Sequence, residues 1–147
     1  MSEPTVFDKI VSGEFPSYKV WEDDNYLAFL SRWPNTPGFT VVVPKKNPGA
    51  NYLDAADDVY TGLLVAAKKV ATKLRKAFNV DRVGLIIEGE GVPHLHIKLI
   101  PMHDSGERDK HEPVFNETYQ GYLITVDGPE ASSEELQAVQ KKIQEAA

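Results

Sequence analysis

Two histidines and a lysine alternate with apolar residues in the stretch GEGVPHLHIKLIP, residues 89–101. Successive side chains of a β-strand point to opposite faces of the sheet. We therefore expect His94, His96 and Lys98 to share one face, and the apolar residues between them to share the other. Imidazole and ammonium groups on one face could have no specific role, could bind a metal ion, or could react with an anionic group.

The first two of these possibilities are a solvated surface and a metal site. The histidines could be ordinary polar residues on a solvated sheet face, although the neighbouring proline and glycines make that less natural. They could instead bind a metal ion, with a third ligand among Glu88, Glu90 and His103. Against a metal site, Lys98 would place a fixed positive charge beside a dication.

The third possibility is nucleophilic catalysis at phosphorus. A neutral imidazole can attack a phosphoryl centre through one nitrogen while the other nitrogen is oriented by a hydrogen bond. His96 is the best nucleophile because His94 and Lys98 place a nitrogen on each side of it. Lys98 and backbone N–H groups around residues 89–92 would stabilise the phosphoryl oxygens, and the Lys98 charge would disfavour the imidazolium form of His96.

The elements that must position this stretch follow from the apolar pattern. The first twelve residues or so predict a short helix capped by Ser2 or Thr5 and ended by Gly13. A hairpin with its turn at residues 23–25 follows, and residues 40–43 form a buried, central strand. Residues 57–78 predict one long helix, with Asp54 as its cap. Strands over residues 83–89 and 94–100 are joined by a glycine-rich turn.

The chain after Pro101 has a different character. Residues 104–113 are charged and aperiodic, which is typical of an exposed loop. Residues 118–129 resume a strand-like pattern, and residues 131–144 predict a helix capped by Ser132 or Ser133. The order of elements indicates an α+β fold, an antiparallel sheet with its helices on one face and the histidines facing outward on the other. We predict a single domain over residues 1–147, with a core at 1–103 and an extension at 104–147.

Composition limits the classes of partner. The net charge of −6 would repel a polyanion, so we expect no nucleic-acid partner. No apolar run is long enough to suggest a membrane span, and we expect no membrane partner. The chain has no cysteine and does not start with a secretory pattern, so a cytoplasmic location fits best.

Several separate blocks make the sequence resemble the histidine triad (HIT) nucleotide-binding superfamily. They are VFDKIVSGEFPSYKVWEDD, YLAFLSRWPNTPGFTVVVPKK, the long helix and HLHIKLIP. Lys98 stands where that superfamily usually has its third histidine. The resemblance implies a homodimer, with the long helix and a strand edge at its interface, and a pocket for a nucleotide, preferably a purine nucleotide. It also implies His96 as the nucleophile, supported by His94 and Lys98, and no cofactor.

The resemblance also places binding residues, with departures from the usual pattern. Ser31 stands where an aspartate commonly holds the ribose, and Asn47 and Phe39 replace frequent histidines. Glu90 stands where a glutamine often donates to the phosphate, beside Gly91 and Val92, and would repel a phosphate unless it is protonated or paired with Lys98. Thr5 and Asp8 occupy positions that are zinc-binding cysteines in some relatives, so we expect no metal.

The function expected from these residues is cleavage at the α-phosphate of a nucleotide. The substrate would be a nucleoside phosphoramidate, an acyl-adenylate or a dinucleoside polyphosphate, and the intermediate would be a nucleotidyl-histidine. Two alternatives remain open because of Glu90 and Ser31: a nucleotide-binding module with little or no turnover, and a dimeric scaffold with a vestigial pocket. The tail beyond residue 101 would cover the core or form a lid over the nucleotide.

Overall fold

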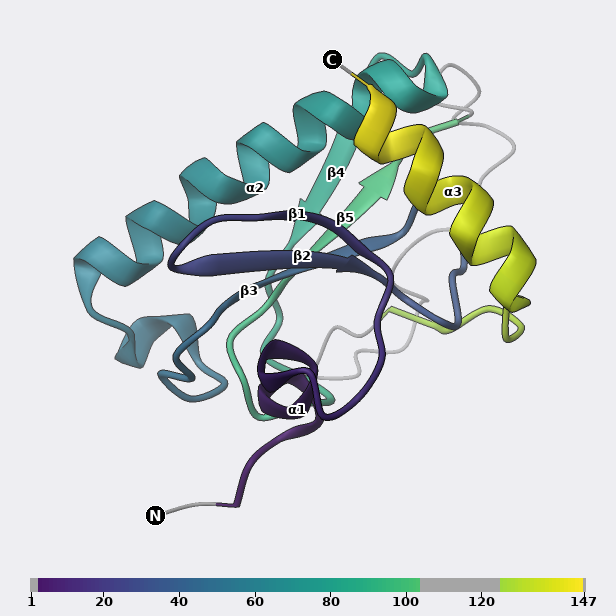
Figure 1. Ribbon diagram of the computed structural model, residues 1–147. Helices are drawn as coiled ribbons and strands as arrows, with labels where there is room; N and C mark the ends of the chain where they lie inside the picture. Colours follow the sequence, from purple (N-terminus) through teal and green to yellow (C-terminus); the bar gives the residue numbers. More distant parts are fainter. Residues whose placement is uncertain (1–2, 104–124, 147) are drawn as a thin grey trace, which may run out of the picture.

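A five-stranded antiparallel sheet lies at the centre of the protein (Figure 1). The structure is a computed structural model that describes residues 3–103 and 125–146. Its strands are β1 (Lys19–Glu22), β2 (Tyr26–Leu30), β3 (Thr40–Pro44), β4 (Val83–Ile86) and β5 (Ile97–Pro101). They lie in the order β1-β2-β3-β5-β4, so that β3 is central, as predicted, and all five of its residues are buried. The predicted α+β class is confirmed.

The predicted hairpin joins β1 to β2 through a turn that begins at Asp23. The carboxylate of Asp23 accepts hydrogen bonds from the backbone N–H groups of Asn25 and Tyr26, at 2.9 and 2.8 Å. An aspartate that bonds the backbone two or three residues on fixes a tight turn. The hairpin therefore places β2 beside β3 in a regular antiparallel register.

Two long helices cover one face of the sheet. The helix α2 (Asp57–Phe78) packs on β3 and β5, and α3 (Ser133–Glu145) packs on α2 and β1. Figure 1 shows both helices on the same side of the strands. The larger core lies between these layers and includes Leu63, Val70 and Leu74 of α2, Leu136 and Ile143 of α3, and Leu95, Ile97 and Leu99 around β5.

The short helix α1 (Val6–Ser12) lies on the opposite face (Figure 1). Its residues Phe7, Ile10 and Val11 pack against a second core formed by Leu27 and Phe29 of β2 and by Phe39, Val41 and Val43 in and before β3. Our expectation that all helices share one face, leaving the other free, was therefore wrong. The apolar stripe of α1 requires an apolar surface, and the first face is already covered by α2 and α3.

The helix caps agree with the sequence in two of three cases. Thr5 caps α1 and Ser132 caps α3, each in a reciprocal capping box, and Gly13 ends α1 with a positive φ of 86°. The predicted cap of α2 was wrong. Asp54 instead ends a short 3-10 helix, Tyr52–Asp54, and α2 begins after Ala56 without a side-chain cap.

The two strands around the histidine stretch are shorter than predicted. β4 ends at Ile86, and β5 begins at Ile97 instead of at residue 94. The backbone leaves the sheet between them: the N–H of Leu95 donates to the carbonyl of Gly49 at 2.7 Å, and Gly89 and Gly91 adopt positive φ angles of 77° and 87°. Glycine adopts such angles without strain, as the predicted glycine-rich turn requires.

Beyond β5, the structure describes residues 102–103 and 125–146. The predicted loop at 104–113 and most of the strand-like stretch at 118–129 lie outside the described residues; residues 125–129 contain no strand. This segment runs beside residues 32–35, with backbone hydrogen bonds from Gly128 to Trp33 and from Ala131 to Arg32, at 3.1 and 2.8 Å. None of the described helices combines the length and apolar character needed to cross a bilayer.

Candidate functional site

A pocket of about 610 Å³ opens between α1, the end of β2, the turn after β4 and residues 125–127. Six of the eight residues predicted for the site line it together: Ser31, Glu90, Gly91, Val92, His96 and Lys98. The other two, His94 and Asn47, are not among its lining residues and lie behind it. The pocket thus brings together residues from four distant parts of the sequence.

His96 is at the wall of this pocket, and its ring has a defined orientation. The Nδ1 atom lies 2.8 Å from the backbone oxygen of His94. Since a carbonyl can only accept a hydrogen bond, Nδ1 carries the proton and Nε2 carries the free lone pair. The side chain is 5% exposed. We expected His96 to face solvent from the sheet; instead it is buried, because α1 covers this face and the Phe7 ring packs edge-on against it at 5.1 Å.

The surroundings of His96 keep it neutral. Burial lowers the pKa of His96 below its ordinary value of 6.5, and the positive charge of Lys98 lowers it further. The bond to the His94 carbonyl and the charge of Glu88 act in the opposite direction but are outweighed. At neutral pH the ring is therefore an imidazole with an available lone pair, which is the form that a nucleophile requires.

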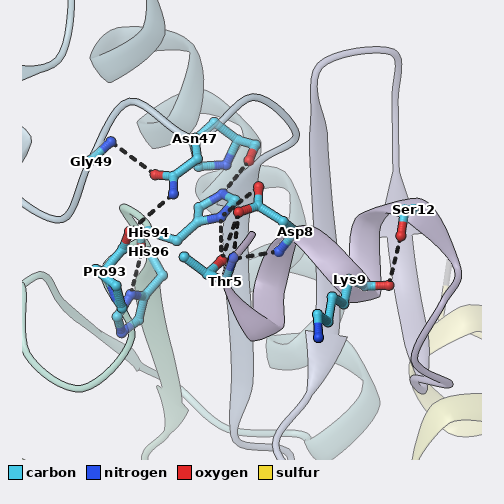
Figure 2. Close-up of polar contacts among 10 residues, drawn as sticks. Thr5, Asp8, Lys9, Ser12, Asn47, Gly49, Pro93, His94 and His96 are labelled. Carbon is cyan, nitrogen blue, oxygen red and sulfur yellow. Dashed lines mark hydrogen bonds and ion pairs between the residues drawn. The ribbon is translucent and has the colours of Figure 1, made fainter. Parts of the chain in front are cut away.

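His94 is wholly buried and joins the sheet to the start of α1, as Figure 2 shows. Its Nε2 lies 2.7 Å from the carbonyl oxygen of Pro44, to which it donates, so the neutral ring accepts at Nδ1. Near Nδ1 are the hydroxyl of Thr5 at 3.3 Å and the carboxylate of Asp8 at 3.5 Å. Burial lowers the pKa of His94, against the bond to Pro44 and the charge of Asp8.

The N-terminus of α1 completes this network. The backbone N–H and hydroxyl of Thr5 donate to Asp8 at 2.7 and 3.0 Å, and the N–H of Asp8 donates back to the Thr5 hydroxyl. Burial raises the pKa of Asp8, but the Thr5 hydrogen bonds and the field of His94 outweigh it and leave the pKa below its ordinary value. The helix cap thus holds a carboxylate beside His94.

Asn47 fixes the backbone just before His94 and that of its own loop, and it is not among the residues that line the pocket. Its amide nitrogen donates to the carbonyl of Pro93 at 3.0 Å, and its amide oxygen accepts from the N–H of Gly49 at 2.8 Å (Figure 2). We expected Asn47 among the nucleotide-binding residues. Its position instead connects the loop after β3 to the turn before His94.

Lys98 lies on the same wall as His96 and is held by two side chains. Its ammonium is 3.0 Å from Oε1 of Glu88 and donates to the hydroxyl of Thr125 at 2.7 Å. The side chains of Lys98 and Glu88 are 14% and 5% exposed. Glu90 has no such contact: it is exposed at the rim. The carboxylate that pairs with Lys98 is therefore Glu88, and not Glu90 as one of our alternatives required.

Ser31 lies at the end of β2, where its hydroxyl oxygen accepts from the N–H of Trp33 at 3.1 Å. The hydroxyl proton remains able to donate into the pocket. Gly91 and Val92 follow the turn, and the N–H of His94 donates to the Val92 carbonyl at 2.8 Å. The three residues border the pocket from two sides, as their predicted binding role requires.

Several lining residues were not predicted from the sequence. Phe7, Ile10 and Phe29 form an apolar wall; their helical and strand periodicity indicated only core packing. Arg32 and Trp33 follow the predicted Ser31, while Thr125 and Asp127 come from the tail. Glu88 was considered only as a metal ligand. No local pattern connects residue 125 to the lysine 27 positions earlier, and only the fold brings them together.

Two of the three residues proposed as the third metal ligand have other partners. Glu88 pairs with Lys98, and Nε2 of His103 lies 2.9 Å from the carbonyl oxygen of Pro37, to which the ring donates. Within residues 3–103 and 125–146, no three side chains of the types His, Cys, Asp and Glu gather as metal ligands do.

The part of the chain that carries the histidines is similar to known proteins. Residues 12–105 match the model of the HIT domain. The adenylylsulfatase HINT1 of Arabidopsis thaliana is 37% identical over 107 residues, which are 66% of this chain and 70% of that protein. The adenosine 5'-monophosphoramidase HNT1 of Saccharomyces cerevisiae is 33% identical over 100 residues, 67% of this chain and 63% of that protein.

Solved structures are similar over nearly the whole chain. A Hit-like protein from Bartonella henselae, crystallised with an unknown ligand, has a TM-score of 0.75 and 30% sequence identity. The similarity covers 99% of this chain and 98% of that one, and so includes the tail. Together with the matched family model, these relatives show that the chain belongs to the HIT domain family.

Proposed function

We propose that the protein is a nucleotide hydrolase that cleaves at the α-phosphate through a nucleotidyl intermediate on His96. The observation that carries the proposal is the hydrogen bond from Nδ1 of His96 to the carbonyl of His94, which leaves the Nε2 lone pair available at a pocket wall. Two relatives in the same family are named for cleaving adenylylsulfate and an adenosine monophosphoramidate, which supports a reaction at a nucleotide phosphate.

The reaction has two displacements at the same phosphorus atom. Nε2 of His96 attacks the α-phosphorus, and the bond from phosphorus to the leaving group breaks; the leaving group keeps the electron pair and takes up a proton from water. Water then attacks phosphorus, the Nε2–P bond breaks, and a nucleoside monophosphate is released. The proton lost by the attacking water balances the proton taken up in the first step.

Lys98 is proposed as the third member of the set, in the role that a histidine has in most relatives. It lines the pocket beside His96 and carries a positive charge that can stabilise the negative oxygens on phosphorus in both displacements. His94 is proposed to support His96 through its carbonyl. Ser31, Glu90, Gly91 and Val92 are proposed to border the nucleotide.

The charges around the pocket help to choose among the substrate classes. Of the described lining residues, two carry positive charge, Arg32 and Lys98, and two carry negative charge, Glu90 and Asp127. Glu88 lies behind and neutralises Lys98. A polyphosphate would therefore gain little attraction. We propose a substrate with a single phosphate, a nucleoside phosphoramidate or an acyl-adenylate, rather than a dinucleoside polyphosphate.

The test is release of adenosine monophosphate from adenosine 5'-phosphoramidate, compared with diadenosine tetraphosphate. His96→Asn keeps a donor for the His94 carbonyl but removes the nucleophilic nitrogen, so it should abolish release. His103→Asn is the matched control, because it removes a histidine outside the pocket, and it should be fully active. Mass spectrometry of wild-type protein quenched during turnover should detect the adenylyl adduct.

Three results would contradict the proposal. Full activity of His96→Asn would exclude the covalent intermediate. Tight binding of adenosine monophosphate with no hydrolysis of any of these substrates would favour the binding-module alternative. Absence of any nucleotide binding would favour a scaffold.

A homodimer is the proposed assembly. In the sheet formed by the described residues, β4 is an edge strand; Leu85 on it is 44% exposed, and Val65 on α2 is 55% exposed. Exposed apolar residues beside an unpaired strand edge suit pairing with a second copy. Light scattering should give the mass of a dimer, and Val65→Glu should shift it towards that of the monomer. A monomeric wild-type protein would contradict this assembly.

A further inference from the structure

Lys98, Glu88 and Thr125, which we call the Lys98 cluster, form a small polar group at the pocket wall. Glu88 is in the turn after β4, Lys98 is on β5, and Thr125 begins the described part of the tail. An ammonium group has three N–H donors. Among the described residues, Glu88 and Thr125 take two of them, which leaves one for a ligand in the pocket that Lys98 lines.

Glu88 has a feature that packing alone does not explain. Its Oε2 atom is buried and, among the described residues, has no hydrogen-bond partner. Leaving a buried carboxylate oxygen unpaired is unfavourable, and an apolar side chain of similar size would avoid this. Such an arrangement is expected where a charge serves a purpose other than stability.

We propose that Glu88 and Thr125 are positioning residues that hold the Lys98 ammonium with its third N–H directed at the phosphate beside His96. A lysine side chain has four rotatable bonds and binds as a mobile point charge, unlike the rigid imidazole that most relatives carry at this position. Two fixed partners remove this freedom before the substrate arrives, so less entropy is lost in the transition state. This inference rests on the proposed function.

The same contacts give the tail a part in the reaction. Thr125 is placed by residues 126–131, which are bonded to residues 32–35: the Asn35 amide donates to the Val126 carbonyl at 2.9 Å, in addition to the two backbone bonds from Gly128 and Ala131. A hydroxyl that orients Lys98 is therefore supplied from outside the strand that carries the histidines. The tail contributes to orientation and does not merely cover the core.

Activity measurements test the two positioning residues separately. Thr125→Val removes the hydroxyl and keeps the shape; it should lower kcat about fivefold and leave KM nearly unchanged. Thr125→Ser keeps the hydroxyl and should restore kcat. Glu88→Gln should lower kcat on the order of tenfold, because a charged partner is lost. In a Lys98→Met background, Glu88→Gln should have little further effect on kcat, because Glu88 acts through Lys98.

A second measurement does not depend on turnover. The charged or titratable groups that act on His96 are Lys98, Glu88 and His94. His94 in turn contacts Asp8. NMR titration of the His96 ring should show a lower pKa in Glu88→Gln and a higher pKa in Lys98→Met, with no change in Thr125→Val. The kinetics should be measured well above pH 6.5, the ordinary pKa of histidine, so that His96 is neutral in every variant.

The outcomes separate this inference from the proposed function. If His96→Asn is inactive but Thr125→Val and Glu88→Gln keep the wild-type kcat, the positioning role is wrong and the reaction stands. If these variants lose thermal stability without a change in kcat, their role is only structural. If the wild-type protein has no activity, the hydrolase proposal fails; an unchanged His96 pKa in both charge variants would then overturn the geometry of the cluster as well.

Discussion

The Nδ1 atom of His96 lies 2.8 Å from the backbone oxygen of His94, two residues earlier in the chain. The second histidine is thus oriented by the main chain of the first, while the ring of the first is bonded to Pro44 and lies beside Thr5 and Asp8. Anything that moves residue 94 moves the hydrogen-bond acceptor of residue 96. The start of α1 therefore affects a nucleophile that it does not bond directly.

Loss of the α1 cap should affect activity as well as stability. Thr5→Ala removes the capping hydroxyl and its contact with His94, so it should lower stability by about 1 kcal/mol and reduce kcat about threefold. Ser132→Ala removes the equivalent cap of α3, which has the same capping box. It should lower stability by a similar amount without changing kcat. Urea unfolding and steady-state kinetics measure both effects; equal kcat values in the two variants would show that the cap does not act on His94.

Stability should fall between pH 7 and pH 5. Burial lowers the pKa of His94 and His96 in the folded protein below the 6.5 of an ordinary histidine. As pH falls below about 6.5, the unfolded chain therefore binds more protons than the folded one, and the free energy of unfolding decreases until the folded pKa values are reached. Urea midpoints over this range should decrease less in His96→Asn, which cannot be protonated there. Activity should decline in the same direction as His96 loses its lone pair.

The exposed carboxylate at the rim should weaken substrate binding. Glu90→Gln removes a negative charge from the pocket lining, so it should lower KM about threefold, and high salt should reduce the difference. Asp24→Asn makes the same charge change in the exposed turn of the hairpin and should leave KM unchanged. A higher KM in Glu90→Gln would instead show that the carboxylate binds the substrate, as a hydrogen-bond acceptor for a sugar hydroxyl would.

A methyl group at position 128 should displace the tail from the pocket. A Cβ atom on Gly128 would clash with the carbonyl oxygen of Pro34, so the two backbones could not both stay in place. Gly128→Ala should therefore lower kcat at least as much as Thr125→Val, because Lys98 loses the same hydroxyl. Gly84→Ala is the control, since its Cβ would meet nothing nearer than 3.7 Å. Wild-type kinetics in Gly128→Ala would show that the tail can move without consequence.

The sequence predicted much of the fold because the local signals were strong. The turn at Asp23, the caps at Thr5 and Ser132 and the periodicity of α2 each depend on residues close together in the chain. The alternation of the histidines with Leu95, Ile97 and Leu99 also held: the three apolar residues are buried in the larger core. Residues that serve one element can be recognised from that element alone.

The site was less predictable because its residues meet through tertiary contacts. The sequence placed His96 and Lys98 on one wall, but it could not show that α1 crosses that face and buries the ring. It named Glu90 as a possible partner of Lys98, whereas the partner is Glu88, because the direction of the turn that carries both depends on Gly89 and Gly91. Asn47 was assigned to the ligand because it stands where similar proteins often have a histidine; its bonds to Pro93 and Gly49 could not be seen in the sequence.

The tail contacts two separate parts of the protein, one on each side of the sheet. Leu136 and Ile143 of α3 fill the larger core, while Thr125 bonds Lys98 on the opposite side of the sheet. A protein cut after residue 103 would lose both contacts at once. Its loss of activity could then come from aggregation or from the missing Thr125, and an activity assay would not separate the two. Insertions or deletions between residue 103 and α3 should therefore be tolerated only where both attachments can still be made.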